Sequence, residues 1–145
     1  MKYITKTIRH NFEQRYLIET TTNCSYRFRF CHVVPNCRSR IKILILAGDT
    51  AHVKVDATIA IASTAPGSDA WLEIHVVTRD QATVIAAPNL EINHNAVRAG
   101  HALSTKQISL EEMFYCARGG LSPQQTEQLI LNGLRQPYLT SGRIL

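Results

Sequence analysis

The chain has 145 residues, of which 45% are hydrophobic and 19% are charged, and its formal net charge is +5. This length and composition are typical of one globular domain with its own hydrophobic core. The longest apolar run, residues 43–48, is too short to cross a bilayer, and the N-terminal residues lack the apolar stretch of a signal peptide. We therefore expect a cytoplasmic protein with no membrane partner.

The basic charge favours anionic partners, nucleic acid among them. Lysine and arginine are frequent in the N-terminal third, but no RRM, KH, helix-turn-helix or zinc-finger pattern accompanies them. A solvated basic face is therefore favoured over a nucleic-acid-binding domain, which stays an alternative.

Four cysteines are present, and a cytoplasmic chain keeps them as reduced thiols. Cys24, Cys31 and Cys37 are separated by six and five residues, without the close C-x2-C pair of common zinc or ferredoxin sites. Partly buried structural thiols are favoured over a metal role for these three. Cys116 is expected to be a small apolar filler of a helix.

From residue 26 onward the sequence predicts a series of short β-strands. Residues 26–31 alternate apolar and basic side chains, and residues 71–77 place Leu72, Ile74 and Val76 on one face. Residues 12–18 fit either an edge strand or a short helical turn. Turns are expected at Pro35-Asn36, Gly48-Asp49, Pro66-Gly67-Ser68-Asp69 and Asp80-Gln81. Further strands are expected at residues 41–46, 53–56, 58–63, 83–85 and, as the last, 90–92.

About eight strands thus follow one another with no helix between them. This order fits either an antiparallel sandwich or a parallel β-helix whose coils each hold two or three short strands. The absence of an Asn-Gly or Asp-Gly hairpin signal slightly weakens the sandwich. No strict sequence repeat is present, so periodicity alone does not identify a β-helix.

Two short helices are predicted after the strands. Ser109 and Glu112 form a capping box, followed by an apolar stripe of Leu110, Met113, Phe114 and Ala117 that Gly119-Gly120 ends. We expect Phe114, like Trp71, to lie in the core. The second helix starts at Ser122-Pro123, carries a stripe of Leu129, Ile130 and Leu134, and stops at Pro137. The tail from Thr140 is expected to be loose.

The residues from Pro88 to Pro137 resemble the C-terminal end of the SufB/SufD family, the scaffold proteins of the SUF iron–sulfur cluster assembly system. The resemblance rests on an ordered set: Leu90-Glu91-Ile92, Val97, Gly100-His101-Ala102, Phe114-Tyr115, Arg118-Gly119-x-Leu121-Ser122 and Leu129-Ile130-x-Asn132-Gly133. It is good over about residues 41–139. It implies one domain: a short right-handed parallel β-helix over 1–97, a loop over 98–108, C-terminal helices over 109–139 and a tail over 140–145.

The resemblance also implies a function. Family members pair through their β-helix edges, bind the ABC-type ATPase SufC through the helical end, and build a nascent cluster near the subunit interface. His101 occupies the position of a SufD-type histidine in the loop after the last strand. Ala102 stands where the SufB type has a glutamate, and no cysteine between Arg38 and Tyr115 matches the SufB-type thiol. Residues 114–116 look more like the SufB type, so this mixture assigns the chain to neither branch.

These observations give the candidate site. His101 lies between glycine and alanine, so its imidazole is accessible as a ligand for iron or a transient iron–sulfur cluster, and His94 is a second candidate seven residues earlier. The expected partners are a SufC-like ATPase and a SufB/SufD-like subunit or a second copy in a homodimer. The expected partner interface consists of Phe114, Tyr115, Arg118, Leu129 and Ile130.

No catalytic function is predicted. The sequence has no Ser-His-Asp order, no Walker loop and no G-x-G-x-x-G run. A scaffold or accessory component is therefore the first hypothesis, and a structural protein-interaction module without metal is the alternative beside nucleic-acid binding.

Overall fold

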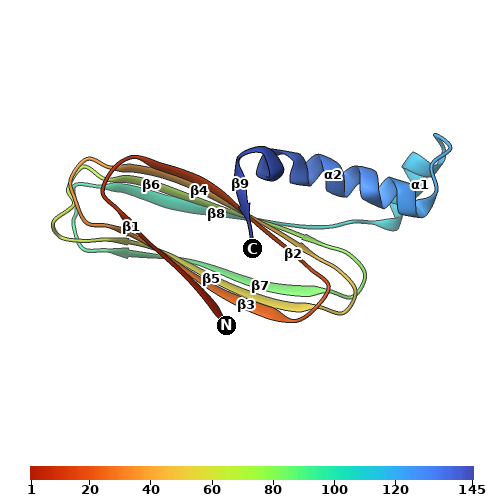
Figure 1. Cartoon of the computed structure of the whole chain (residues 1–145), viewed down its shortest axis with the longest axis horizontal. Helices are drawn as coiled ribbons and strands as arrows, with labels where there is room; N and C mark the ends of the chain where they lie inside the picture. The colour runs from red at the N-terminus through yellow and green to blue at the C-terminus, as the bar shows by residue number, and fades with distance from the viewer.

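The computed structural model describes the backbone of residues 1–145 and all side chains except those of Leu110, Cys116 and Ala117. Eight strands wind into a flattened solenoid, followed by two helices and a short ninth strand (Figure 1). The strands are β1 Lys2–Ile8, β2 Phe12–Thr20, β3 Cys24–His32, β4 Arg38–Ala47, β5 His52–Ile61, β6 Asp69–Thr78, β7 Thr83–Ile92, β8 Arg98–Gln107 and β9 Gly142–Ile144. The helices are α1 Leu110–Ala117 and α2 Pro123–Ser141.

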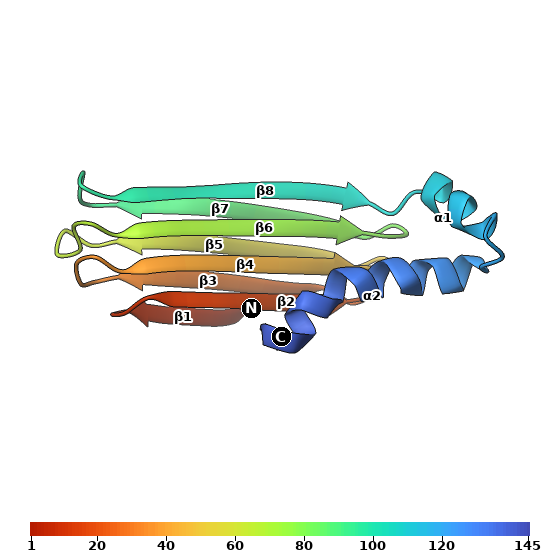
Figure 2. The same cartoon turned by 90° about the horizontal axis from the view of Figure 1, so that it is seen from above.

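Successive strands alternate between two sheets. Sheet A has the order β1-β3-β5-β7, and sheet B has the order β8-β6-β4-β2-β9. All pairings between neighbouring strands are parallel, so each coil of the chain contributes one strand to each sheet (Figure 2). The parallel β-helix is therefore confirmed, and the antiparallel sandwich is excluded.

The coils differ in length, which explains why the sequence shows no strict repeat. In sheet A, Lys2 pairs with Tyr26, Cys24 with Val53 and His52 with Thr83, which are offsets of 24, 29 and 31 residues. The stacked strands keep their register, so the differences in coil length fall in the corners between strands. Three corners contain a non-glycine residue with positive φ: Asn36, Asp49 and Asp80. Asparagine and aspartate tolerate this conformation better than other residues.

The hydrophobic core fills the space between the two sheets. Its N-terminal part is aromatic: the Tyr16 and Phe28 rings are 5.2 Å apart, and Phe28 stacks on Phe30 at 6.0 Å. Toward the C-terminus the buried residues become aliphatic, such as Ile59 and Ile74. Parallel pairing places residues of one inward position directly above one another, so each coil covers the apolar face of its neighbour.

The final coil corrects the predicted boundaries. The expected strands at 83–85 and 90–92 are one continuous strand, β7, and residues 98–107 form strand β8 where a loop over 98–108 was predicted. Nearly every residue of β8 is exposed, because no further coil covers it. Exposure removes the demand for alternating apolar residues, which is why this strand has a polar sequence. The ambiguous residues 12–18 belong to strand β2.

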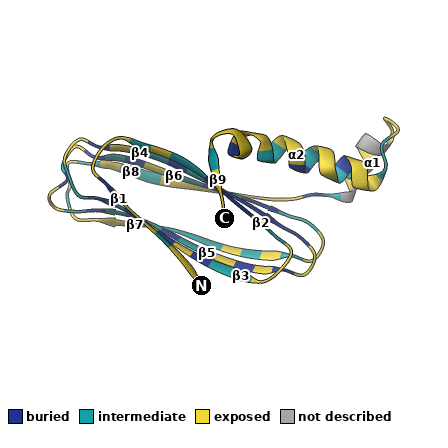
Figure 3. Ribbon diagram, viewed as in Figure 1, coloured by how far each residue is buried: buried dark blue, intermediate teal, exposed yellow. Residues whose placement is uncertain are grey.

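Helix α2 runs back across the outer face of sheet B (Figure 2). Its capping box is formed by Ser122 and Gln125, and the Ser109 hydroxyl accepts from the Glu112 N–H at 3.2 Å before α1. Leu131 and Tyr138 of α2 pack with Leu44, Leu46 and Val77 of the sheet. The remainder of the helix is largely exposed (Figure 3). Of the stripe predicted for the second helix, Ile130 and Leu134 pack partly against this cluster, whereas Leu129 is exposed.

Two more predictions about this region were wrong. Pro137 does not end the second helix, which continues to Ser141, and the tail is not loose, because Gly142–Ile144 pair with Arg15–Leu17 of β2. The buried Tyr138 and the strand pairing hold the last helical turn in place. The structure does not describe the side chains of Leu110 and Ala117, which belong to the stripe predicted for the first helix, or that of Cys116. Within the residues that the structure covers, no helix is both long and apolar enough to cross a membrane.

Candidate functional site

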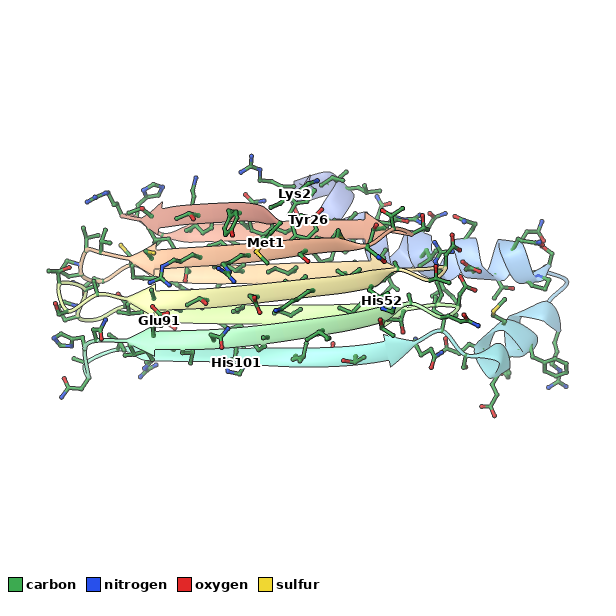
Figure 4. The ribbon with its side chains drawn as sticks, turned by 90° about the horizontal axis from the view of Figure 1, so that it is seen from below. Met1, Lys2, Tyr26, His52, Glu91 and His101 are labelled. Carbon is green, nitrogen blue, oxygen red and sulfur yellow. The ribbon has the colours of Figure 1, made fainter. Side chains whose placement is uncertain are left out.

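His101 lies on strand β8, at the open end of the solenoid, and not in a loop. It pairs with Leu72, whose side chain is fully buried in the core. His101 therefore occupies an inward-facing position of the last coil, but it is exposed because no coil lies beyond it. Figure 4 shows it at the edge opposite Lys2. An imidazole at this place is accessible to a second subunit stacked on the open end.

His94 is not part of a common site with His101 in one chain. It lies in the turn between β7 and β8, and its Nδ1 accepts a hydrogen bond from the Ala96 N–H at 3.0 Å. His101 is the fourth residue of β8, so it lies roughly 10 Å along the strand from Arg98. Among the described side chains, no three His, Cys, Asp or Glu residues come together as a metal site.

The three N-terminal cysteines are separate free thiols. Cys24 and Cys31 lie at opposite ends of β3, and Cys37 is buried in the following turn with its Sγ 3.8 Å from the Pro35 carbonyl oxygen. Burial raises the pKa of Cys24, which favours the neutral thiol over the thiolate. The arrangement supports the structural interpretation of these residues.

The helical end presents an exposed apolar surface. Phe114 and Tyr115 are 70% and 76% exposed, so the prediction that Phe114 lies in the core was wrong. Leu129 is 59% exposed and Arg118 is also exposed, whereas Ile130 packs partly on the sheet. A pocket of about 410 Å³ is lined by Lys106, Glu111, Glu112, Tyr115 and Ile130. Exposed aromatic side chains beside a surface pocket are typical of protein interaction sites.

Some arginines of the N-terminal third form ion pairs with acidic side chains of other strands. Arg40 pairs with Asp69 at 3.0 Å and Arg27 with Asp56 at 3.8 Å on adjacent strands, and Arg29 of β3 reaches Glu91 of β7 at 2.7 Å across β5. The Arg40 hydrogen bond holds the pKa of Asp69 below its usual value. These pairs neutralise part of the basic charge of the N-terminal third.

Sequence reasoning missed a polar network on the outer face of sheet B. Glu73 accepts from Trp71 Nε1 at 2.9 Å and contacts His75 Nε2 at 3.0 Å, and His75 Nδ1 lies 2.7 Å from the Ser104 hydroxyl. Partial burial raises the pKa of Glu73, but the bonds from Trp71 and His75 outweigh it and the net shift is downward. Trp71 is 37% exposed and lies against Gly100, which corrects its predicted core position. Alternation along β6 alone places Trp71, Glu73 and His75 on one face, and only the cross-strand register, which the sequence does not give, adds Ser104.

Comparisons with known proteins identify the family of the chain. The family model described as "SUF system FeS cluster assembly, SufBD core domain" matches residues 2–134. Iron–sulfur cluster assembly SufBD family proteins of Mycobacterium bovis and Mycobacterium tuberculosis are each 32% identical over 111 residues, and one of Mycobacterium leprae is 29% identical. Each match covers 70% of this chain and 28% of the relative, so the chain spans a minor part of their length. The chain belongs to the SufBD core domain family of the SUF system for iron–sulfur cluster assembly.

Proposed function

We propose that the chain is a scaffold or accessory component of iron–sulfur cluster assembly. It would pair with a second subunit through the open end of the solenoid, formed by β7 and β8, and work with an ABC-type ATPase. The observation that carries this proposal is the inward-facing side of β7 and β8, the last strands of the two sheets, which is half-buried on β7 and largely exposed on β8. Leu103, which pairs with the buried Ile74, is 46% exposed there. A second SufBD-type subunit covering this end would satisfy both the strand edges and the apolar residues.

A two-fold pair built on these edges would bring two copies of His101 to one interface. Neutral imidazole is a suitable ligand for iron, and two copies supply what one chain lacks. The nascent cluster would be cargo, held only until it is passed on. ATP hydrolysis belongs to the partner in this proposal, and the chain itself catalyses no reaction.

The experiment is anaerobic reconstitution with ferrous iron and sulfide, followed by absorption spectroscopy and iron determination. The wild type should bind iron and gain visible absorption, and His101→Ala should lose most of both. His10→Ala is the matched control, because His10 is exposed in the turn between β1 and β2, away from the open coil. Identical spectra for the wild type and His101→Ala would remove His101 from the site.

The exposed aromatic surface on α1 supports the ATPase contact. Replacement of Phe114 and Tyr115 by glutamate should abolish co-purification with a SufC-like ATPase. Ile85→Ser, which changes a 68% exposed side chain on strand β7, should leave the ATPase bound. Retention of the ATPase by the double glutamate variant would place the contact elsewhere.

A metal-free interaction module is the second candidate, because Ala102 replaces a possible ligand and the described side chains contain no preformed metal group. Binding of the ATPase together with no iron uptake by the wild type would favour this candidate over the first.

A further inference from the structure

Strands β4, β6 and β8 of sheet B begin side by side, at the end of the solenoid where the chain passes from sheet A to sheet B (Figure 2). Their first residues are Arg38, Asp69 and Arg98, and the register pairs Arg38 with Asp69 and Asp69 with Arg98. Asp69 precedes Ala70, whose side chain belongs to the core, so alternation places Asp69 and its two partners on the outer face of the sheet. One row thus crosses three neighbouring strands and holds a carboxylate between two arginines.

A third arginine neutralises the carboxylate of this row. Arg40 Nη2 donates to Asp69 Oδ2 at 3.0 Å, and Arg40 Nη1 donates to the Asp69 carbonyl oxygen at 3.1 Å. Arg38 and Arg98 are exposed and, among the described side chains, neither forms an ion pair. The Arg40 hydrogen bond lowers the pKa of Asp69 most, and the charges of Arg40, Arg38 and Arg98 lower it further, so the two unpaired guanidinium groups also lie near the carboxylate. Three positive charges and one negative charge leave this cluster with a net charge of +2.

Two hollows flank the Arg40–Asp69 pair. One, of about 460 Å³, is lined by Asp69, Arg98 and residues 67–68 and 95–97, and the other, of about 400 Å³, is lined by Arg38, Arg40 and residues 11–13. Both volumes are in the range of small-ligand sites. Glu13 lines the second hollow and repels an anion from it. Of the described residues that line the first hollow, Asp69 alone is acidic, and because Arg40 neutralises it, the first hollow favours an anion.

We propose that the hollow beside Arg98 binds a phosphate group, either free phosphate or the phosphate of a nucleotide. The planar guanidinium of Arg98 matches two phosphate oxygens at once, and Asn95, which lines the same hollow, carries an amide that can donate to a third. Arg38 adds a second positive charge from across the Arg40–Asp69 pair. A phosphate dianion would balance the net charge of the cluster. The site is separate from the open end and the helical surface on which the proposed function depends.

An aromatic ring on the same face gives a nucleotide a second contact. Trp71 is two residues after Asp69 on β6, so its side chain lies on the outer face of the sheet as well. Its ring lies against Gly100, two residues after Arg98, and its Nε1 donates to Glu73 at 2.9 Å, which together fix the orientation of a side chain that is 37% exposed. A base stacked on this ring would add binding energy that free phosphate does not gain. Trp71 is the single tryptophan, so its fluorescence reports directly on the site.

The test is equilibrium dialysis of the full chain at low salt against radiolabelled inorganic phosphate and, separately, adenosine monophosphate, with tryptophan fluorescence as a second readout. The wild type should bind both saturably, with one site per chain, and added chloride should weaken the binding. Acetate, which has the same bidentate geometry but a single charge, should compete about tenfold more weakly than phosphate. Tighter binding of the nucleotide with quenching of Trp71 would identify a nucleoside phosphate as the ligand, and equal affinities would identify the phosphate group alone.

Three variants separate this site from general attraction to a basic protein. Arg98→Gln should weaken phosphate binding about tenfold or more, because it removes the charged hydrogen bonds. Arg38→Gln, which acts only through its charge, should weaken binding about two- to fivefold. Lys54→Gln removes an exposed positive charge of β5 in sheet A and should leave the affinity unchanged. No saturable binding of either ligand by the wild type overturns the proposal, and so does an equal loss of affinity in all three variants.

Discussion

Replacing His32 should change how the stability of the solenoid depends on pH. The His32 side chain is fully buried at the end of β3, with Nε2 2.7 Å from the Ser39 hydroxyl and no hydrogen-bond partner for Nδ1. Burial lowers the pKa of His32 from its usual 6.5, and the Asp69 carboxylate offsets this only in part. The folded protein therefore keeps this imidazole neutral at a pH where the unfolded chain protonates it.

The sign and the size of the effect follow from proton linkage. Because the folded pKa lies below the unfolded one, the stabilisation is complete above pH 6.5 and is lost as the pH falls. A single histidine that stays neutral when folded lowers the free energy of unfolding by at most about 1.4 kcal/mol between roughly pH 7.5 and 5.5. This is a measurable part of the total, which is roughly 7–20 kcal/mol for a chain of this size.

Urea unfolding followed by circular dichroism at the two pH values measures this loss. His32→Leu should be less stable at both, because Ser39 loses its partner, but it should lose less stability than the wild type on acidification. His10→Leu, a change at an exposed turn, should keep the wild-type dependence. An equal loss in the wild type and His32→Leu would refute the reasoning, since buried His32 would then not be the group that takes up the proton.

Two further predictions concern packing. A Cβ at Gly100 would lie 2.5 Å from Cζ3 of Trp71, so Gly100→Val should shift the fluorescence of the single tryptophan and cost about 1–3 kcal/mol of stability in urea titrations; an unchanged spectrum would contradict this. The control is Gly133→Ala, because a Cβ at Gly133 has no neighbouring atom within 4 Å. This substitution should stabilise α2 by up to about 1 kcal/mol. Phe28→Ala should cost about 3–5 kcal/mol by the same assay, because the ring is fully buried between Tyr16 and Phe30; a loss below 1 kcal/mol would contradict the aromatic core.

The sequence predicted the strands best where a strand has neighbours on both sides. Residues 71–77 alternate because β6 lies between β4 and β8 with one face in the core, and the apolar positions Leu72, Ile74 and Val76 are all buried. β8 has one neighbour and little burial, so its sequence lacks the alternation that predicts a strand. The resemblance identified the β-helix where periodicity did not, because the coil lengths vary.

The packing of α2 and the position of His101 could not be predicted from the sequence for a different reason. The residues of α2 that pack on sheet B depend on the direction in which the helix crosses the strands, and this direction is not encoded in local periodicity. Leu131 is buried and Leu129 is exposed for this reason alone. His101 was found as a residue, but its place at an open coil follows from the stacking order. The network of Glu73, His75 and Ser104 required the register between β6 and β8.

Helix α2 makes contacts that an ordinary solenoid lacks. In a solenoid each coil touches only its neighbours, and stability is roughly a sum of local terms. Here Arg79, after β6, pairs with Glu127 at 2.6 Å, and Arg135 donates to both Glu19 carboxylate oxygens of β2 at 2.8 and 2.7 Å. One helix thus ties the third coil to the first, and β9 then pairs with the edge of β2. This pairing covers only Arg15–Leu17 of β2, so β9 adds a short local brace to the first coil, while β7 and β8 stay open at the far end of the solenoid.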